Sequence, residues 1–185
     1  LNLLERIQEI SGHLDGEAYL VGGFIRNSLL GISSTDLDIV TTSSSWECGE
    51  TFRREIGGTL FPLDSPRGIF RLTLNDSNEL GISHLDLSEV KGGILRDLEK
   101  RDFTINAMAI PLNQCRSSPS NWNVIDPTLG LTDLKQRVIR MTHPNVFHED
   151  PIRMLRATRL ASQLEFEIEN ETFTTIQQDR FLLRK

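Results

Sequence analysis

The sequence predicts an α+β fold in which a mixed sheet of about five strands is flanked by helices and followed by a helical segment. Three observations carry this prediction. A short apolar run at 18–21 leads through Gly22-Gly23 into a helical pattern. The segment 36–40 alternates charged and aliphatic residues, as a strand with one buried face does. From Asp133 onward the apolar residues recur at helical spacing, through Leu164 and again from Thr172 to Leu183.

Each element before Asp133 has its own local signal. Leu3, Leu4, Ile7 and Ile10 recur at helical spacing, and Ser11-Gly12 ends that helix. A second helix ends at Gly31, and a third runs through Phe52 to Gly57-Gly58. Strands are expected at 18–21, 36–40, 59–63, 68–74 and 80–87, with turn residues at 64–66 and 75–78 between the last three. We therefore assign 1–132 to one domain and 133–185 to the start of a helical second domain.

Composition limits what this segment does alone. A formal charge of −6 argues that it does not grip a nucleic-acid backbone by itself, since that needs clustered Lys and Arg. Two cysteines, Cys48 and Cys115, indicate neither a disulfide framework nor a zinc cluster, and they fit a reducing compartment.

No apolar stretch approaches the ~20 residues that span a bilayer, so we expect a cytoplasmic protein. The start at Leu1 and the end at Lys185 within helical sequence are typical of a fragment.

The first candidate constellation is the glycine turn Gly22-Gly23 with Arg26, placed between a strand and a helix. Glycine lets backbone N–H groups approach phosphate oxygens, and the helix N-terminus adds positive potential. Arg26 adds a two-pronged donor. A plain tight turn would explain Gly-Gly alone.

The second constellation is Asp36 and Asp38, two residues apart on the next predicted strand. Their carboxylates then point to the same face and can meet a pair of Mg²⁺ ions, which lie about 3.5–4 Å apart in two-metal sites. Asp86 is the candidate third carboxylate, because it ends a predicted strand that can lie beside this one; Glu89 is its rival. A solvated strand face would explain an isolated Asp-x-Asp, but the glycine turn upstream favours a site.

A third group of candidates is Arg101, Asp102 and Asn106. Arg101 is suited to a triphosphate, and the other two to ribose hydroxyls. A local ion pair with Asn106 ending a turn is the alternative.

The last group is Asp150 and Arg153, followed by Arg156 and Arg159 at steps of three. Asp150-Pro151 is also typical of a helix N-cap. Three cations without interleaved acids, however, repel one another unless something anionic is near. The carboxylate of Asp150 is a hydrogen-bond acceptor and the guanidinium of Arg153 is a donor. Side by side, they would match the pairing edges of adenine and cytosine and reject those of guanine and uracil. Such a pair would select ATP and CTP without a template.

Together these motifs resemble the class II tRNA nucleotidyltransferases (CCA-adding enzymes) and the related bacterial poly(A) polymerases of the DNA polymerase beta nucleotidyltransferase superfamily. The resemblance covers nearly the whole chain through four motifs in order: LVGGFIRNSLLG, DLDIVTT, KRDFTINAMAI and HEDPIRMLRATRLASQLEF. It implies a catalytic head followed by a helical neck that reads the nucleobase.

The resemblance also implies roles for individual residues. Asp36 and Asp38 would bind magnesium; Gly23, Arg26 and Arg101 would hold the nucleotide. Asp150 and the three arginines of its motif would read the base and bind phosphate.

The function implied is template-independent addition of CMP and AMP to the 3′ end of tRNA by two-metal phosphoryl transfer. Two Mg²⁺ ions would be the cofactors and ATP and CTP the substrates. The RNA would be held mainly by regions that this chain lacks.

Three features depart from the family pattern. Asn27 stands where the family usually has Asp, the stretch from Asp86 to Arg101 is short, and the tRNA-gripping body and tail are missing. In the family, a flexible loop in that stretch is associated with switching from CTP to ATP. CC-only, A-only and poly(A) addition therefore stay open, as does a nucleotide-binding module that has lost turnover.

Overall fold

The computed structural model describes residues 2–74, 79–115 and 118–184, and the predicted turn at 75–78 lies outside the described residues. The chain forms two compact units, and it passes between them three times. The first unit comprises Leu1–Ile94 and Ala109–Ile125, and the second comprises Leu95–Met108 and Asp126–Lys185. The division of the sequence into domains at 132/133 stays a prediction about domain boundaries.

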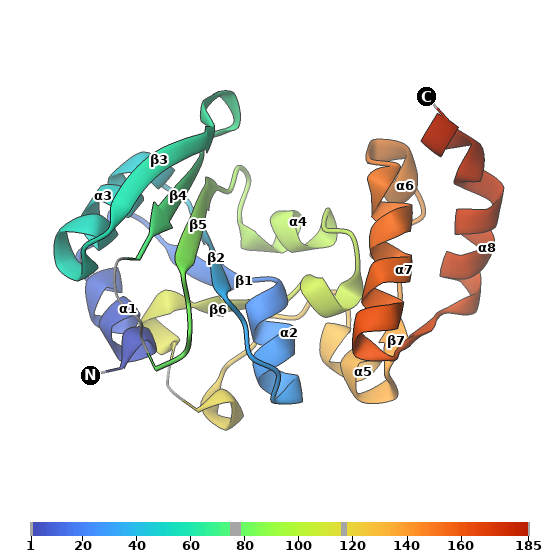
Figure 1. The fold of residues 1–185 in the computed structure, drawn as a ribbon, viewed down its shortest axis with the longest axis horizontal. Helices are drawn as coiled ribbons and strands as arrows, with labels where there is room; N and C mark the ends of the chain where they lie inside the picture. The colour runs from blue at the N-terminus through green and yellow to red at the C-terminus, as the bar shows by residue number, and fades with distance from the viewer. Residues whose placement is uncertain (1, 75–78, 116–117, 185) are drawn as a thin grey trace. The chain divides into compact units, whose positions relative to one another are not determined.

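The first unit is built on a six-stranded mixed sheet, one strand more than about five (Figure 1). Its strand order is β3-β4-β5-β2-β1-β6. Only the β2–β5 pair is parallel; the other four pairs are antiparallel. The strands are β1 Ala18–Val21, β2 Asp36–Thr41, β3 Thr59–Asp64, β4 Ile69–Thr73, β5 His84–Glu89 and β6 Ala109–Pro111.

The helices of this unit end where the sequence predicts. In α1, Leu3–Ser11, the four periodic apolar residues are all buried, and Asn2 and Glu5 form a capping box at its start. The left-handed Gly31 ends α2, Gly23–Leu30. Ser44 accepts from Glu47 N at the start of α3, Ser45–Ile56, which stops at Gly57. The short 3₁₀ turns are Ser65–Arg67, Leu112–Gln114 and Pro119–Asn121.

The two faces of the sheet differ in chemistry. Leu72, Leu85 and Leu37 pair across β4, β5 and β2, and all three are fully buried. Helix α3 packs on this face, where Gly49 lies so close to Leu60 of β3 that a Cβ would be 2.8 Å from its side chain. Because side chains alternate along a strand, Asp38 and Asp86 point to the opposite face.

The second unit is mainly helical. Its helices are α4 Ile94–Glu99, α5 Gly130–Gln136, α6 Val146–Glu149, α7 Ile152–Leu164 and α8 Asn170–Asp179, with 3₁₀ turns at Thr104–Asn106 and Arg180–Arg184. A small parallel pair joins β7, Val138–Ile139, to β8, Glu167–Ile168. The region after Asp133 is therefore helical as predicted, but β7 and β8 interrupt it. Phe103, Ile105 and Phe147 lie in its core, each fully buried.

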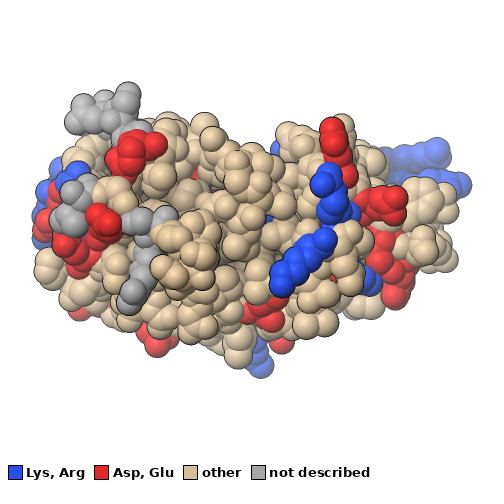
Figure 2. Space-filling model, turned by 90° about the horizontal axis from the view of Figure 1, so that it is seen from below, with Lys and Arg blue, Asp and Glu red and all other residues tan. Residues whose placement is uncertain are grey.

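Within the described part of the chain, no helix combines the length and apolar character needed to cross a membrane. On the face drawn in Figure 2, the described acidic and basic side chains are both present and form no broad basic surface. This agrees with the negative net charge of the sequence.

Candidate functional site

The predicted acidic residues of the first unit lie side by side. Asp36 and Asp38 are both on β2, two residues apart, and both are partly exposed. Strand β5 lies directly beside β2, and Asp38 pairs with Asp86 in the parallel register. Adjacent strands are about 4.8 Å apart. The sheet thus brings the three carboxylates to one face, although Asp86 lies in the middle of β5 and not at its end as the sequence predicted.

Glu89, the rival third carboxylate, belongs to the other face. Glu89 is three positions after Asp86 on β5, so its side chain lies on the opposite face of the strand, with Leu85 and Leu87. Its Oε1 accepts from the backbone N of Ser45 at 3.3 Å and lies 3.4 Å from the Ser45 hydroxyl. Glu89 therefore stabilises the start of α3.

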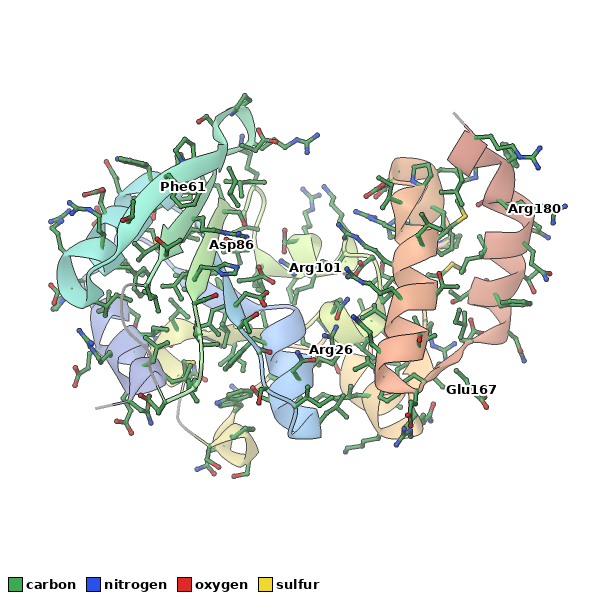
Figure 3. All side chains as sticks on the ribbon, viewed as in Figure 1. Arg26, Phe61, Asp86, Arg101, Glu167 and Arg180 are labelled. Atoms are coloured by element: carbon green, nitrogen blue, oxygen red, sulfur yellow. The ribbon has the colours of Figure 1, made fainter. Side chains whose placement is uncertain are left out.

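Asp86 has a partner that the sequence analysis missed. Arg71 of β4 donates from Nε to Oδ1 at 2.6 Å and from Nη2 to Oδ2 at 2.7 Å. Figure 3 labels Asp86 on β5. The only sequence signal for this partner is a charged residue that stands between apolar residues in β4, IFRLT.

The donor set suits a hard cation with several water or phosphate ligands. Among the described residues, no group of three or more His, Cys, Asp or Glu side chains is arranged to hold a metal ion. Asp36 and Asp38 supply two carboxylates on one face of β2. Mg²⁺ is commonly bound through one or two carboxylates plus substrate phosphates. Asp36 and Asp38 fit that requirement. The metal-binding roles of all three aspartates stay predictions.

The glycine turn begins beside these carboxylates. Val21, the last residue of β1, pairs with Asp38, so Gly22 and the start of α2 follow at the same end of the sheet. Gly22 has φ 76° and ψ −138°, a conformation that other residues rarely adopt, and no side chain caps the helix. A short loop with open helical N–H groups is the geometry that favours an anion.

Arg26 folds back over this turn. A Cβ on Gly23 would lie 3.4 Å from its Nη2, so a bulkier residue would crowd the guanidinium. Asn27 Oδ1 accepts from Arg26 Nε at 3.0 Å and from Nη2 at 2.8 Å, and its amide donates to Ser34 at 2.9 Å. Asn27 thus orients the arginine with a neutral acceptor. Figure 3 labels Arg26 on α2.

In the second unit, Asp102 joins two of the other predicted residues. It is 9% exposed, and its Oδ1 accepts from the Asn106 amide at 3.3 Å. Its Oδ2 accepts from Arg156 Nη1 at 3.4 Å. Arg101 is paired instead with Asp97 of α4, with Nη2 and Nε both 3.0 Å from Oδ2. Arg101 therefore does form a local ion pair, but with Asp97, which lies outside the stretch 101–106 and had no signal beyond its i,i+4 spacing, whereas Asp102 pairs with Arg156.

Asp150 and Arg153 lie side by side at the start of α7, with Arg153 Nε 4.0 Å from Asp150 Oδ2. Asp150 Oδ1 also accepts from the backbone N of Ile152 at 3.0 Å, as a residue stabilising a helix start does. Both readings of this aspartate therefore have a structural basis. Arg153 Nη1 lies 3.4 Å from Glu149 as well.

Arg153, Arg156 and Arg159 were expected to lack acidic partners, and this expectation is wrong for two of the three. Arg153 is paired with Glu149, and Arg156 is paired with Asp102 from a different segment of the chain. Their charges are offset within the protein, so they need no external anion to coexist. Arg159 is exposed, and no ion pair of it is found among the described residues.

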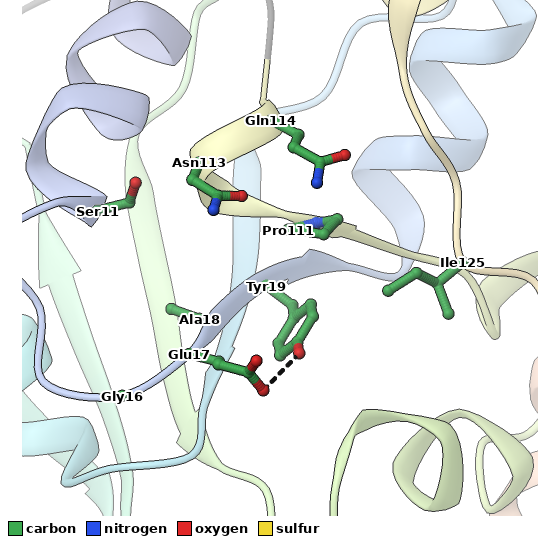
Figure 4. A pocket seen from close by; sticks show the side chains of 9 residues that line it. All are labelled: Ser11, Gly16, Glu17, Ala18, Tyr19, Pro111, Asn113, Gln114 and Ile125. Carbon is green, nitrogen blue, oxygen red and sulfur yellow. Dashed lines mark hydrogen bonds between the residues drawn. The ribbon is translucent and has the colours of Figure 1, made fainter.

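None of the predicted site residues lines the cavity shown in Figure 4. This cavity, of about 280 Å³, lies in the first unit between the end of α1, β1 and the segment after β6. Tyr19 donates its hydroxyl hydrogen to Glu17 at 2.8 Å at its wall. Burial raises the pKa of Tyr19, and the hydrogen bond to Glu17 and the charge of Glu17 raise it further. Nothing in this lining offers the carboxylate pair or the glycine turn described above.

Comparison with known proteins gives a consistent result. Residues 18–140 match the model of the Poly A polymerase head domain. The chain is 38% identical over 171 residues to the CC-adding tRNA nucleotidyltransferase of Geobacter sulfurreducens, covering 92% of this chain and 37% of that protein. It is 35% identical over 193 residues to the CCA-adding enzyme of Ligilactobacillus salivarius, covering 100% of this chain and 45% of that one.

A solved structure of a CCA-adding enzyme in complex with CTP superposes with a TM-score of 0.84 at 34% identity, covering 99% of this chain and 44% of that chain. The chain therefore spans less than half the length of these relatives.

Proposed function

Since this chain belongs to the family of the Poly A polymerase head domain, we propose that its protein is a template-independent nucleotidyltransferase that adds CMP and AMP to the 3′ end of tRNA. The single observation that carries the proposal is the placement of Asp36 and Asp38 on one face of β2, beside the uncapped glycine turn of α2. A triphosphate bound at that turn would lie next to the two carboxylates. Relatives that carry out tRNA nucleotidyl addition support the same reading.

Asp36 and Asp38 are the residues that would hold two Mg²⁺ ions, with Asp86 beside them. When bound, the ions would lower the pKa of the RNA 3′-hydroxyl and neutralise the leaving pyrophosphate. The chain itself contributes the orientation of these groups. The rigid pairing of β2 with β5 and β1 holds both carboxylates, and Asn27 fixes Arg26 over the turn for the phosphates.

The second unit carries the residues proposed to select and orient the nucleotide. The carboxylate of Asp150 and the guanidinium of Arg153 provide an adjacent acceptor and donor. Asp102 and Asn106 would bond ribose hydroxyls, while Arg101, Arg156 and Arg159 would bind phosphate. We further propose that 1–132 is the catalytic head and that 133–185 begins the helical neck.

The relatives include both CC-adding and CCA-adding enzymes, so the product is best defined by experiment. The net charge of −6 supports an RNA held mainly by other parts of the full-length protein. A cytoplasmic location fits a substrate such as tRNA.

The test is an assay of the full-length protein with Mg²⁺, single nucleotides and tRNAs that end before CCA, after C or after CC. Sequencing the 3′ ends identifies the product. We expect each of the three tRNAs to be extended until its 3′ end reads CCA. Stopping after CC identifies a CC-adding enzyme, growth only on the CC end identifies an A-adding one, and long A tails identify poly(A) addition. Nucleotide binding without any incorporation would overturn the proposal.

A further inference from the structure

The structure places an arginine among the proposed metal ligands. Arg71 pairs with Asp86 across β4 and β5, and Asp86 pairs with Asp38 across β5 and β2. Residues paired in this way point to the same face, so the cation and the two acids form one row across three strands. Asp36 lies on the same face, two residues before Asp38.

The contact between Arg71 and Asp86 is short and two-pronged. Both carboxylate oxygens accept a guanidinium hydrogen, at 2.6 and 2.7 Å, and both side chains are partly buried. Such paired hydrogen bonds fix the plane of the carboxylate as well as its position. Asp86 is therefore not free to turn both oxygens toward a metal ion while this pair persists.

The charge of Arg71 also acts on the other two acids. Asp38 lies on the strand beside Asp86, and Asp36 lies two residues before it, on the face that Arg71 shares. The positive charge of Arg71 therefore offsets part of the negative potential that a divalent cation would meet at Asp36 and Asp38.

We propose that Arg71 is a positioning residue of this site. It fixes Asp86 through both carboxylate oxygens, and it lowers the affinity for divalent cations of the carboxylate cluster formed by Asp36, Asp38 and Asp86. The proposal rests on the proposed function, because it takes Asp36 and Asp38 as the metal ligands. One positive charge among three negative ones leaves the cluster attractive to a cation. It also limits the mutual repulsion of the aspartates before the cation binds.

The test measures Mn²⁺ binding by electron paramagnetic resonance, because Mn²⁺ accepts the same oxygen ligands as Mg²⁺. Arg71→Gln removes the charge and the paired geometry, whereas Arg71→Lys keeps the charge but loses the geometry. Arg54→Gln, on the exposed surface of α3, is the matched control for loss of one positive charge. Thermal melting with each variant establishes that it is folded.

We expect Arg71→Gln to bind Mn²⁺ about tenfold more tightly, with the Lys variant and the Arg54 control within about twofold of the wild type. Nucleotide incorporation should fall about tenfold in kcat in both Arg71 variants, since neither holds Asp86 by two bonds. Unchanged or weaker Mn²⁺ binding in a folded Arg71→Gln protein overturns the inference.

The inference and the proposed function fail in different ways. A wild-type protein that binds Mn²⁺ with nucleotide, and loses that binding in Asp38→Asn, retains the proposed metal site whatever Arg71 does. A wild type that binds no Mn²⁺ in the presence of nucleotide overturns the metal chemistry itself, and the inference with it.

Discussion

Thr104 donates its hydroxyl hydrogen to the buried carboxylate of Asp133, at 2.7 Å between Oγ1 and Oδ2. Asp133 is 3% exposed and also accepts from Arg140 Nε at 3.0 Å. Arg140 in turn lies 3.4 Å from Glu169, at the start of α8. One buried carboxylate of helix α5 thus connects the segment after Asp102 with the residue that follows β7 in the second unit.

We predict that Asp133→Asn lowers the free energy of unfolding by about 2 kcal/mol, because it leaves a buried donor and a guanidinium with a weaker acceptor. Thr104→Val should cost about 1 kcal/mol. Urea denaturation measures both, and Asp15→Asn in an exposed loop is the control for the loss of one carboxylate. The double variant should cost less than the two single changes added together, since they share one bond. Strict additivity would contradict the coupling.

Burial of Cys48 and Cys115 predicts a loss of stability in alkali. Burial raises the pKa of each thiol from the ordinary value of 9.0 to about 12. Between these two pH values the unfolded chain loses the proton while the folded chain keeps it, so rising pH favours unfolding. Stability is fully present below pH 9 and falls by up to about 1.4 kcal/mol per pH unit for each cysteine.

Urea denaturation at pH 8 and pH 10 tests this prediction. The wild type should lose about 2 to 3 kcal/mol more over this range than the Cys48→Ala/Cys115→Ala variant, which lacks both thiols. The comparison uses the change with pH within each protein, so a general effect of the substitutions on stability cancels. Equal changes in the two proteins would refute the prediction.

Asp36→Asn should abolish nucleotide incorporation while leaving the fold intact. The substitution removes the charge of a partly exposed carboxylate and almost no volume, so its effect on stability should stay within about 0.5 kcal/mol. Incorporation should fall at least about a thousandfold if this carboxylate holds a metal ion in the reaction. The assay uses single-nucleotide incorporation with Mg²⁺, with Asp15→Asn as the control of equal charge change. Full activity of Asp36→Asn would remove it from the site.

The sequence predicted elements well where the signal is local. The apolar run at 18–21 predicted β1, the flanking glycines predicted α2, and the alternation in 36–40 predicted β2, each almost to the residue. Strand β6 was missed because it has three residues and exists through pairing with the distant β1. The start of β5 was placed too early, at Leu80, because the positive φ of Gly81 turns the chain before His84.

The candidate site shows the same division. The shared face of Asp36 and Asp38 follows from strand alternation alone, and so it was predictable. The partner of Asp86 depends on which residue of β4 lies opposite it, and strand register is a property of the folded sheet. Likewise, the pairing of Arg156 with Asp102 joins residues 54 positions apart. No spacing rule along the chain could have supplied either contact.

Arg153→Gln and Arg159→Gln should affect nucleotide use in different ways. Arg153 has an acidic neighbour at 4.0 Å and so can present a donor beside an acceptor, whereas Arg159 is exposed on α7. Loss of the donor at 153 should lower the preference for CTP and ATP over GTP and UTP by about 10-fold to 100-fold, which is the cost of one or two lost base contacts. Loss of the charge at 159 should raise KM for all four nucleotides by a similar factor.

Competition assays with all four nucleotides separate the two effects. Because Arg153 also lies 3.4 Å from Glu149, part of its effect could arise from a disturbed helix start. Glu149→Gln measures that part together with a 3.6 Å contact between Glu149 and His143, since it removes the same ion pair but leaves the guanidinium in place. If Glu149→Gln relaxes nucleotide choice as much as Arg153→Gln does, then the ion pair shapes the helix and Arg153 does not read the base. If only Arg153→Gln relaxes it, base reading is the better account, because the donor itself is what the wrong nucleotides fail to match.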